Sequence, residues 1–101
     1  MQTMTFFERF ERDILAGRKT ITLRDHSESY FKADETVVAA NLETGISYGQ
    51  LYITDVAWVN FDDLNEHHAR QENMSLADLK KLIREIYPEI EQLYQITFKL
   101  L

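Results

Sequence analysis

The sequence predicts an α+β fold in which a small, mostly antiparallel sheet is curled, or closed into a barrel, and flanked by helices. Segments with strand-like alternation outnumber those with helical spacing, and the two kinds do not alternate regularly as parallel βαβ units require. The chain has 101 residues, of which 45% are hydrophobic, so it is long enough to bury one core. We therefore expect a single domain over residues 1–101.

The N-terminal segment has the spacing of an amphipathic helix that ends at a glycine. Thr5 and Glu8 match a capping box, which predicts a helix over about residues 6–16. Gly17 suits the left-handed backbone conformation with which many helices end. The apolar residues that follow the helical spacing are Phe6, Phe7, Phe10, Ile14 and Leu15.

A short strand with two different faces follows this helix. Ile21 and Leu23 share one face of the strand, because side chains alternate between the two sides of a β-strand. Thr20, Thr22 and Arg24 share the other face. The pattern predicts a strand over residues 20–24 with one apolar and one polar surface.

Three longer segments complete the predicted sheet. After a polar loop over residues 25–35, segments 36–42 and 46–59 are rich in β-branched and aromatic residues and are joined by a turn at 43–45. We expect these two strands to form a hairpin. The alternation returns over residues 93–101, which predicts the last strand.

Two further helices are predicted before the last strand. Asn60 can cap a helix over about residues 61–72. Ser75 can cap the next helix, which Pro88 ends. The apolar stripe of this second helix consists of Leu76, Leu79, Leu82, Ile83 and Ile86.

Composition and charge exclude several classes of protein. The net charge is −6, from 17 acidic and 11 basic residues, which argues against a broad phosphate-binding surface but leaves room for a pocket that binds a small nucleoside. The absence of cysteine excludes a disulfide framework, a thiolate nucleophile and a zinc–thiolate site. No apolar run reaches the roughly 18 residues of a membrane span, and the N-terminus lacks the pattern of a signal peptide. We expect a cytoplasmic protein.

Glu72 is the first candidate for chemistry. On a helix that starts near residue 61, it falls on the same face as Phe61, Leu64 and His68. A carboxyl group beside an apolar face is partly desolvated, which raises its pKa and suits it to proton donation. The alternative is that the helix frays by residue 70 and Glu72 points to solvent.

Lys19 and Thr22 are the second candidate. A neutral lysine can remove the proton of a threonine hydroxyl and make it a nucleophile, as in Ser–Lys hydrolases. Burial and the neighbouring cations Arg18 and Arg24 would both lower the pKa of Lys19. Strict alternation, however, places Lys19 and Thr22 on opposite strand faces, so they converge only if the strand begins after Lys19 or twists at Thr20. The alternative is a surface lysine beside an ordinary strand threonine.

His67, His68 and Glu72 allow a metal site to be considered. His68 and Glu72 lie one helical turn apart, as metal ligands on a helix often do. The spacing suggests no third ligand and places His67 elsewhere, so we expect no metal.

Several motifs make the chain similar to a known family. Gly17, Lys19 and Arg24 match the Gly-x-Lys-x-x-Glu-x-Arg signature of the ASCH domain, a member of the PUA-like fold superfamily, with Thr22 in place of the glutamate. With that threonine, the chain resembles the small bacterial subfamily of N(4)-acetylcytidine amidohydrolases over nearly its whole length. The shared segments are Phe6-Phe7-Glu8-Arg9-Phe10, Asp13 to Asp25, His68 to Met74 and Ile86-Tyr87-Pro88.

The resemblance implies a PUA-like fold and assigns three catalytic roles. Lys19 corresponds to the subfamily's proton acceptor, Thr22 to its nucleophile and Glu72 to its proton donor. The implied reaction is hydrolysis of the acetyl amide of acetylcytidine to cytidine and acetate, without a metal or organic cofactor. Arg24 is a further candidate, for substrate binding or for stabilising the oxyanion.

The resemblance also implies the kind of partner. We expect a small nucleoside substrate and no membrane partner. The sequence does not determine the oligomeric state, for which a monomer is the default. The alternative function is an RNA-binding or RNA-cleaving module, as is common among PUA-like folds.

Overall fold

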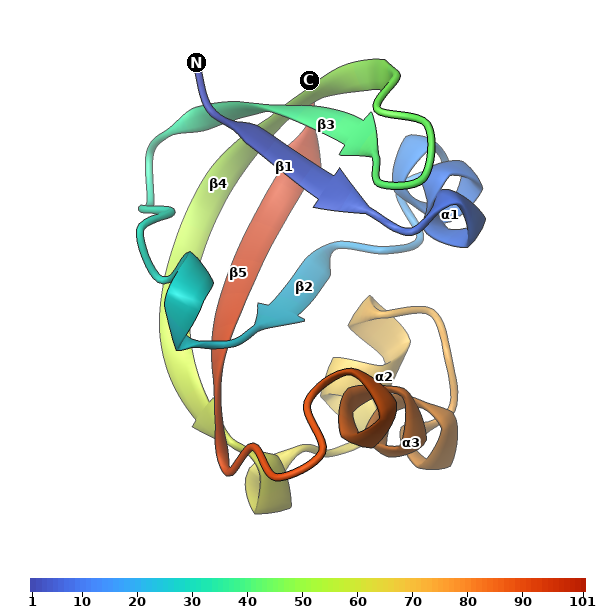
Figure 1. The fold of residues 1–101 in the computed structure, drawn as a ribbon, viewed down its shortest axis with the longest axis vertical. Helices are drawn as coiled ribbons and strands as arrows, with labels where there is room; N and C mark the ends of the chain where they lie inside the picture. Colours follow the sequence, from blue (N-terminus) through green and yellow to red (C-terminus); the bar gives the residue numbers. More distant parts are fainter.

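A curled five-stranded sheet dominates the computed structural model, which describes residues 1–101 (Figure 1). Its strand order is β1-β3-β4-β5-β2; the β1–β3 pair is parallel and the other pairs are antiparallel. The predicted α+β fold with a curled, mostly antiparallel sheet is therefore confirmed, and so is the predicted hairpin, which β3 and β4 form. The strands are β1 Thr3–Phe6, β2 Ile21–Arg24, β3 Thr36–Asn41, β4 Ser47–Asn60 and β5 Gln92–Leu100.

Three α-helices and three short 3₁₀ turns complete the fold. In the view of Figure 1, β2 runs between α1 above it and the α2–α3 pair below it. None of the helices is long and apolar enough to cross a membrane. The helices are α1 Glu11–Leu15, α2 Glu66–Gln71 and α3 Leu76–Ile86, and the 3₁₀ turns are η1 Glu8–Phe10, η2 His26–Glu28 and η3 Phe61–Asp63.

The predicted start of the first helix, at residue 6, is wrong. Instead of continuing back to residue 6, the helix begins with η1, and the residues before it form strand β1. Met4 and Phe6 point into the core while Thr3 is exposed, so the segment also fits a strand. Pairing of β1 with the open edge of β3 satisfies its backbone, and a capping pattern cannot reveal such a distant partner.

The second predicted helix also starts later than expected. Asn60 makes no capping bond; Leu64 has an extended backbone, and Asn65 caps α2 by accepting from His67 N at 2.9 Å. The cap of α3 is predicted correctly, because Ser75 Oγ accepts from Asp78 N at 3.1 Å. The strand predictions agree with the structure to within one or two residues.

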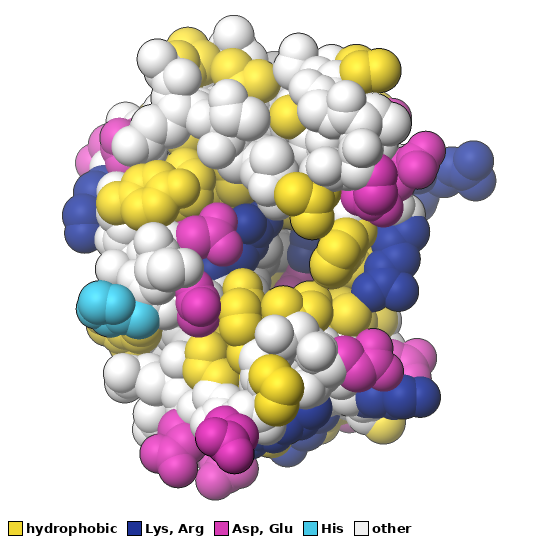
Figure 2. Space-filling view, viewed as in Figure 1, with side chains coloured by type: hydrophobic (Ala, Val, Ile, Leu, Met, Phe, Trp, Pro, Cys, Tyr) yellow, Lys and Arg dark blue, Asp and Glu magenta, His cyan; other side chains and the backbone are white.

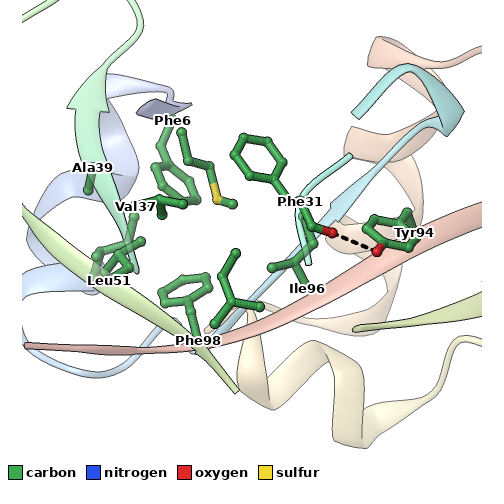
Figure 3. Close-up of a cluster of buried hydrophobic side chains, with 11 residues drawn as sticks. Phe6, Phe31, Val37, Ala39, Leu51, Tyr94, Ile96 and Phe98 are labelled. Atoms are coloured by element: carbon green, nitrogen blue, oxygen red, sulfur yellow. Dashed lines mark hydrogen bonds between the residues drawn. The ribbon is translucent and has the colours of Figure 1, made fainter. Parts of the chain in front are cut away.

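The buried side chains form two clusters. The larger, which we name the barrel core, fills the curl of the sheet (Figure 3), and its buried phenol is satisfied because Tyr94 Oη donates to Phe31 O at 2.7 Å. The smaller, the helix core, joins β2 to α2 and α3. The barrel core consists of Met4, Phe6, Ile14, Phe31, Val37, Ala39, Leu51, Ile53, Tyr94, Ile96 and Phe98, and the helix core of Ile21, Leu23, Leu64, Ala69, Leu79, Ile83 and Leu93.

Candidate active site

A cavity of about 260 Å³ lies between the two cores. Figure 2 shows the hollow on this face, with hydrophobic side chains around it and charged side chains deeper inside. An apolar wall with a few polar groups is typical of a small-molecule site. The lining residues are Thr5, Phe6, Phe7, Phe10, Lys19, Thr22, Leu23, Arg24, Glu28, Leu42, Glu72, Leu79, Leu82, Ile83, Ile86 and Tyr87.

Lys19 reaches the cavity because of the turn that ends α1. Gly17 has a φ of 75°, and the bonds from Gly17 N to Ile14 O and from Arg18 N to Asp13 O form a Schellman motif, as the glycine predicted. Strand β2 begins only at Ile21, so the strand alternation does not govern Lys19. The condition under which Lys19 and Thr22 converge is therefore met, and both side chains line the same cavity.

Strand β2 presents its two faces as the alternation predicted. Ile21 and Leu23 belong to the helix core, and Thr22 and Arg24 line the cavity, which Leu23 also borders. All four residues of β2 are buried, so both of its faces are shielded from solvent. A polar strand face that is buried against a cavity keeps its hydroxyl and guanidinium groups away from bulk water.

Glu72 is brought to the same cavity by the end of α2. It is the C-terminal cap of that helix, and the bond from Thr20 N to Gln71 O, 2.8 Å long, fixes the helix end against the start of β2. The sequence placed Glu72 on an inward face, and Glu72 does line the cavity, but the helical face used for that prediction is partly wrong. Of the four positions used to define the inward face, only His68 lies within α2 and Glu72 caps its end, whereas Phe61 and Leu64 precede the helix.

Burial and contact make Lys19 and Glu72 a coupled pair. Lys19, Thr22 and Glu72 are 3%, 5% and 5% exposed, and Lys19 Nζ donates a hydrogen bond to Glu72 Oε1. The ammonium nitrogen also lies 4.8 Å from the centre of the Phe10 ring. Burial, and then the positive charge of Arg24, lower the pKa of Lys19 from 10.5 to about 7, while Asp13 opposes the shift.

Arg24 makes three hydrogen bonds that tie the site together. Its Nε donates to Thr22 Oγ1 at 2.8 Å, its Nη1 to Glu28 Oε1 at 2.8 Å and its Nη2 to Thr5 O at 2.7 Å. Since Thr5 is in β1 and Arg24 in β2, this side chain connects the two outer strands of the sheet. Glu28 was missed in the sequence because it lies in a polar segment that predicted only a loop.

The His68 side chain takes part in capping α2. His68 Nδ1 accepts a hydrogen bond from Asn65 N at 3.1 Å and completes the capping box of α2. Glu72 contacts Lys19, and no group of three or more metal-ligating side chains gathers in the structure.

Comparison with known proteins supports the resemblance in the sequence. No protein-family model matches the chain. It is 56% identical over 96 residues to an N(4)-acetylcytidine amidohydrolase of Vibrio vulnificus strain YJ016, covering 95% of this chain and 92% of that protein. The chain belongs to the N(4)-acetylcytidine amidohydrolase family. A second member, from Serratia proteamaculans strain 568, is 53% identical over 95 residues, covering 94% of this chain and 93% of that protein.

The fold of this N(4)-acetylcytidine amidohydrolase family member is that of an ASCH domain. The crystal structure of the ASCH domain from Lactobacillus crispatus JV V101 superimposes with a TM-score of 0.79, covering 98% of this chain and 79% of that one. Sequence identity to it is only 18%, so the likeness concerns the fold alone. The predicted ASCH, PUA-like fold is confirmed.

Proposed function

We propose that the protein hydrolyses the acetyl amide of N(4)-acetylcytidine to give cytidine and acetate. The observation that carries this proposal is the convergence of buried Lys19, Thr22 and Glu72 on one cavity. The amidohydrolase names of relatives more than half identical to the chain provide the substrate.

The Lys19–Glu72 pair supplies a base and an acid together. An ammonium–carboxylate pair and an amine–carboxylic acid pair have the same total charge, and burial disfavours the separated charges. The lowered pKa of Lys19 makes the neutral amine accessible near pH 7. Passage of one proton from Lys19 to Glu72 therefore prepares both groups for the reaction.

The first half of the reaction forms an acetyl-enzyme. Neutral Lys19 takes the Thr22 proton while Oγ1 attacks the acetyl carbonyl carbon. The carbon–nitrogen bond then breaks, and Glu72 gives its proton to the exocyclic nitrogen, which leaves as the amino group of cytidine.

The second half restores the enzyme. The Glu72 carboxylate takes a proton from water as the water oxygen attacks the acetyl-threonine ester. The ester bond breaks, and the Lys19 ammonium returns a proton to Thr22 Oγ1. One water is consumed and acetic acid is released, so atoms and charges balance.

Arg24 assists the nucleophile. Its Nε donates to Thr22 Oγ1, so the guanidinium stabilises the negative charge that develops on this oxygen. The same positive charge helps to keep Lys19 neutral. Through these two effects Arg24 would help to activate Thr22, in addition to the substrate-binding role expected from sequence.

A free nucleoside fits the protein better than polymeric RNA. The net charge of −6 opposes the attraction of a phosphate backbone, and the cavity is lined mainly by hydrophobic residues. Salt-dependent RNA binding without deacetylation would favour the RNA-binding alternative.

The test is turnover of N(4)-acetylcytidine by the purified protein, with cytidine and acetate both quantified. Glu72→Gln keeps the size of the side chain but cannot donate a carboxylic acid proton, so we expect a loss of at least about 100-fold in kcat. Glu89→Gln is the matched control, because Glu89 is exposed and lies outside the cavity. No cytidine release by the wild type, or full activity in Glu72→Gln, contradicts the proposal.

A further inference from the structure

The Arg24–Glu28 pair has hydrogen-bonding capacity that the protein does not use. A guanidinium carries five N–H donors, and Arg24 directs three of them to Thr22, Glu28 and Thr5. Two donors on the Nη atoms therefore have no protein acceptor, although the Arg24 side chain is only 11% exposed. Glu28 accepts through Oε1, and its Oε2 has no hydrogen-bond partner in the protein. Buried donors without partners carry a free-energy cost, which a ligand can remove.

Donors and an acceptor thus lie side by side in the wall of the cavity. Arg24 and Glu28 are joined at 2.8 Å, and both line the cavity that contains Thr22. The Watson–Crick edge of cytosine offers two acceptors, O2 and N3, followed by the N4–H donor. That order complements two guanidinium donors beside a carboxylate oxygen. Acetylation leaves one hydrogen on N4, so the substrate retains the same edge.

We propose that the Arg24–Glu28 pair recognises the cytosine edge, with Arg24 donating to O2 and N3 and Glu28 accepting from N4–H. This assignment rests on the proposed function, and it makes Glu28 a specificity-determining residue. Since Arg24 also holds Thr22 Oγ1, one side chain aligns the base and the nucleophile. The N4–H bound by Glu28 is retained in the product, and the second hydrogen of the amino group comes from Glu72.

The pair rejects a uracil edge for the same reason. Uracil presents a donor, N3–H, toward the guanidinium and an acceptor, O4, toward the carboxylate. Both contacts are repulsive, and the unmet groups would be buried. We therefore expect the wild-type protein to bind cytidine about 100-fold more tightly than uridine.

The experiment is calorimetric titration of the full chain with cytidine and with uridine, which requires no turnover. Glu28→Gln retains an oxygen that can accept from Arg24, but it replaces the free carboxylate oxygen by an amide N–H₂. This donor is repelled by the N4–H of cytosine and can donate to the O4 of uracil. We expect the preference for cytidine over uridine to fall about tenfold or more. Glu89→Gln, with an exposed side chain outside the cavity, is the matched control and should leave the preference unchanged.

The ratio of the two affinities separates base recognition from a merely structural role. If Glu28 only holds Arg24 in place, Glu28→Gln changes both affinities equally and leaves their ratio unchanged, which overturns the inference. Equal wild-type affinity for the two nucleosides also overturns it. A protein that shows the predicted preference but releases no cytidine from N(4)-acetylcytidine refutes the proposed function and still supports this recognition pair.

Discussion

The barrel core and the cavity beside the helix core use burial in opposite ways. The barrel core consists of hydrophobic side chains, and its one hydroxyl is hydrogen-bonded. The cavity wall, by contrast, contains Lys19, Thr22, Arg24 and Glu72 as buried polar groups around a space of about 260 Å³. Close packing stabilises the first region, whereas the second keeps charges in a poorly hydrated space at a cost to stability. Substitutions in the two regions should therefore separate stability from activity.

The largest expected effect is on activity, from Thr22→Ala. Removal of the proposed nucleophile should lower kcat for N(4)-acetylcytidine by more than about 1000-fold. The Arg24 Nε donor loses its acceptor, which should cost only about 1 kcal/mol of stability. Steady-state kinetics and thermal unfolding of the same preparation measure both quantities. Activity that survives in a folded Thr22→Ala variant would exclude the acetyl-threonine intermediate.

The next effect is on stability, from Ile53→Ala in the barrel core. Ile53 is fully buried in β4 and does not line the cavity. Its truncation should lower the free energy of unfolding by about 2–5 kcal/mol, because a cavity replaces packed atoms. Activity per folded molecule should be nearly unchanged. Denaturant titration with parallel kinetics checks this, and a large kcat loss in the folded variant would show that the two regions are not independent.

The buried pair allows a sharper comparison within the site. Lys19→Met leaves Glu72 without its partner and should destabilise the protein by about 3 kcal/mol while abolishing activity. Replacing both members, as in Lys19→Met with Glu72→Leu, should recover much of this stability but no activity, because hydrophobic replacement of a buried pair is often neutral or favourable. Urea unfolding of the two variants measures the difference. A double variant less stable than Lys19→Met would mean that the pair stabilises the fold.

The smallest effect concerns pH. The reactive form of the Lys19–Glu72 pair carries one proton, which the pair loses as Lys19 titrates with a pKa of about 7. The value of kcat/KM should therefore be level below neutrality and fall about tenfold per pH unit above it. Asp13 raises the pKa of Lys19, so Asp13→Asn should shift this limb to lower pH. The folded state binds the Lys19 proton less tightly than the unfolded state, whose pKa is 10.5. Its contribution to stability is therefore full above that value and is lost as pH falls toward 7.

Kinetic pH profiles of wild type and Asp13→Asn test this directly. A limb that stays in place in Asp13→Asn would assign the titration to a group other than Lys19.

Local signals in the sequence predicted more of the fold than of the site. Gly17 and Ser75 act through bonds within a few residues, so their roles could be read directly. Strand β1 depends on the distant edge of β3, whereas the local capping pattern predicted the start of a helix at its end. Glu28 could not be identified from sequence, because its proposed role depends on the position that the Arg24 guanidinium takes in the folded protein. Contacts between residues far apart in the sequence therefore determine the features that local patterns did not predict.

The connection between β1 and β2 has a mechanical consequence. Backbone hydrogen bonds join all the neighbouring strands of the sheet. The two outer strands, β1 and β2, are instead linked by the side-chain bond from Arg24 Nη2 to Thr5 O. The wall of the barrel can thus widen at this seam without breaking a rung of any ladder. The cavity lies at the seam, so on this side it is bounded by side-chain contacts and not by a backbone ladder.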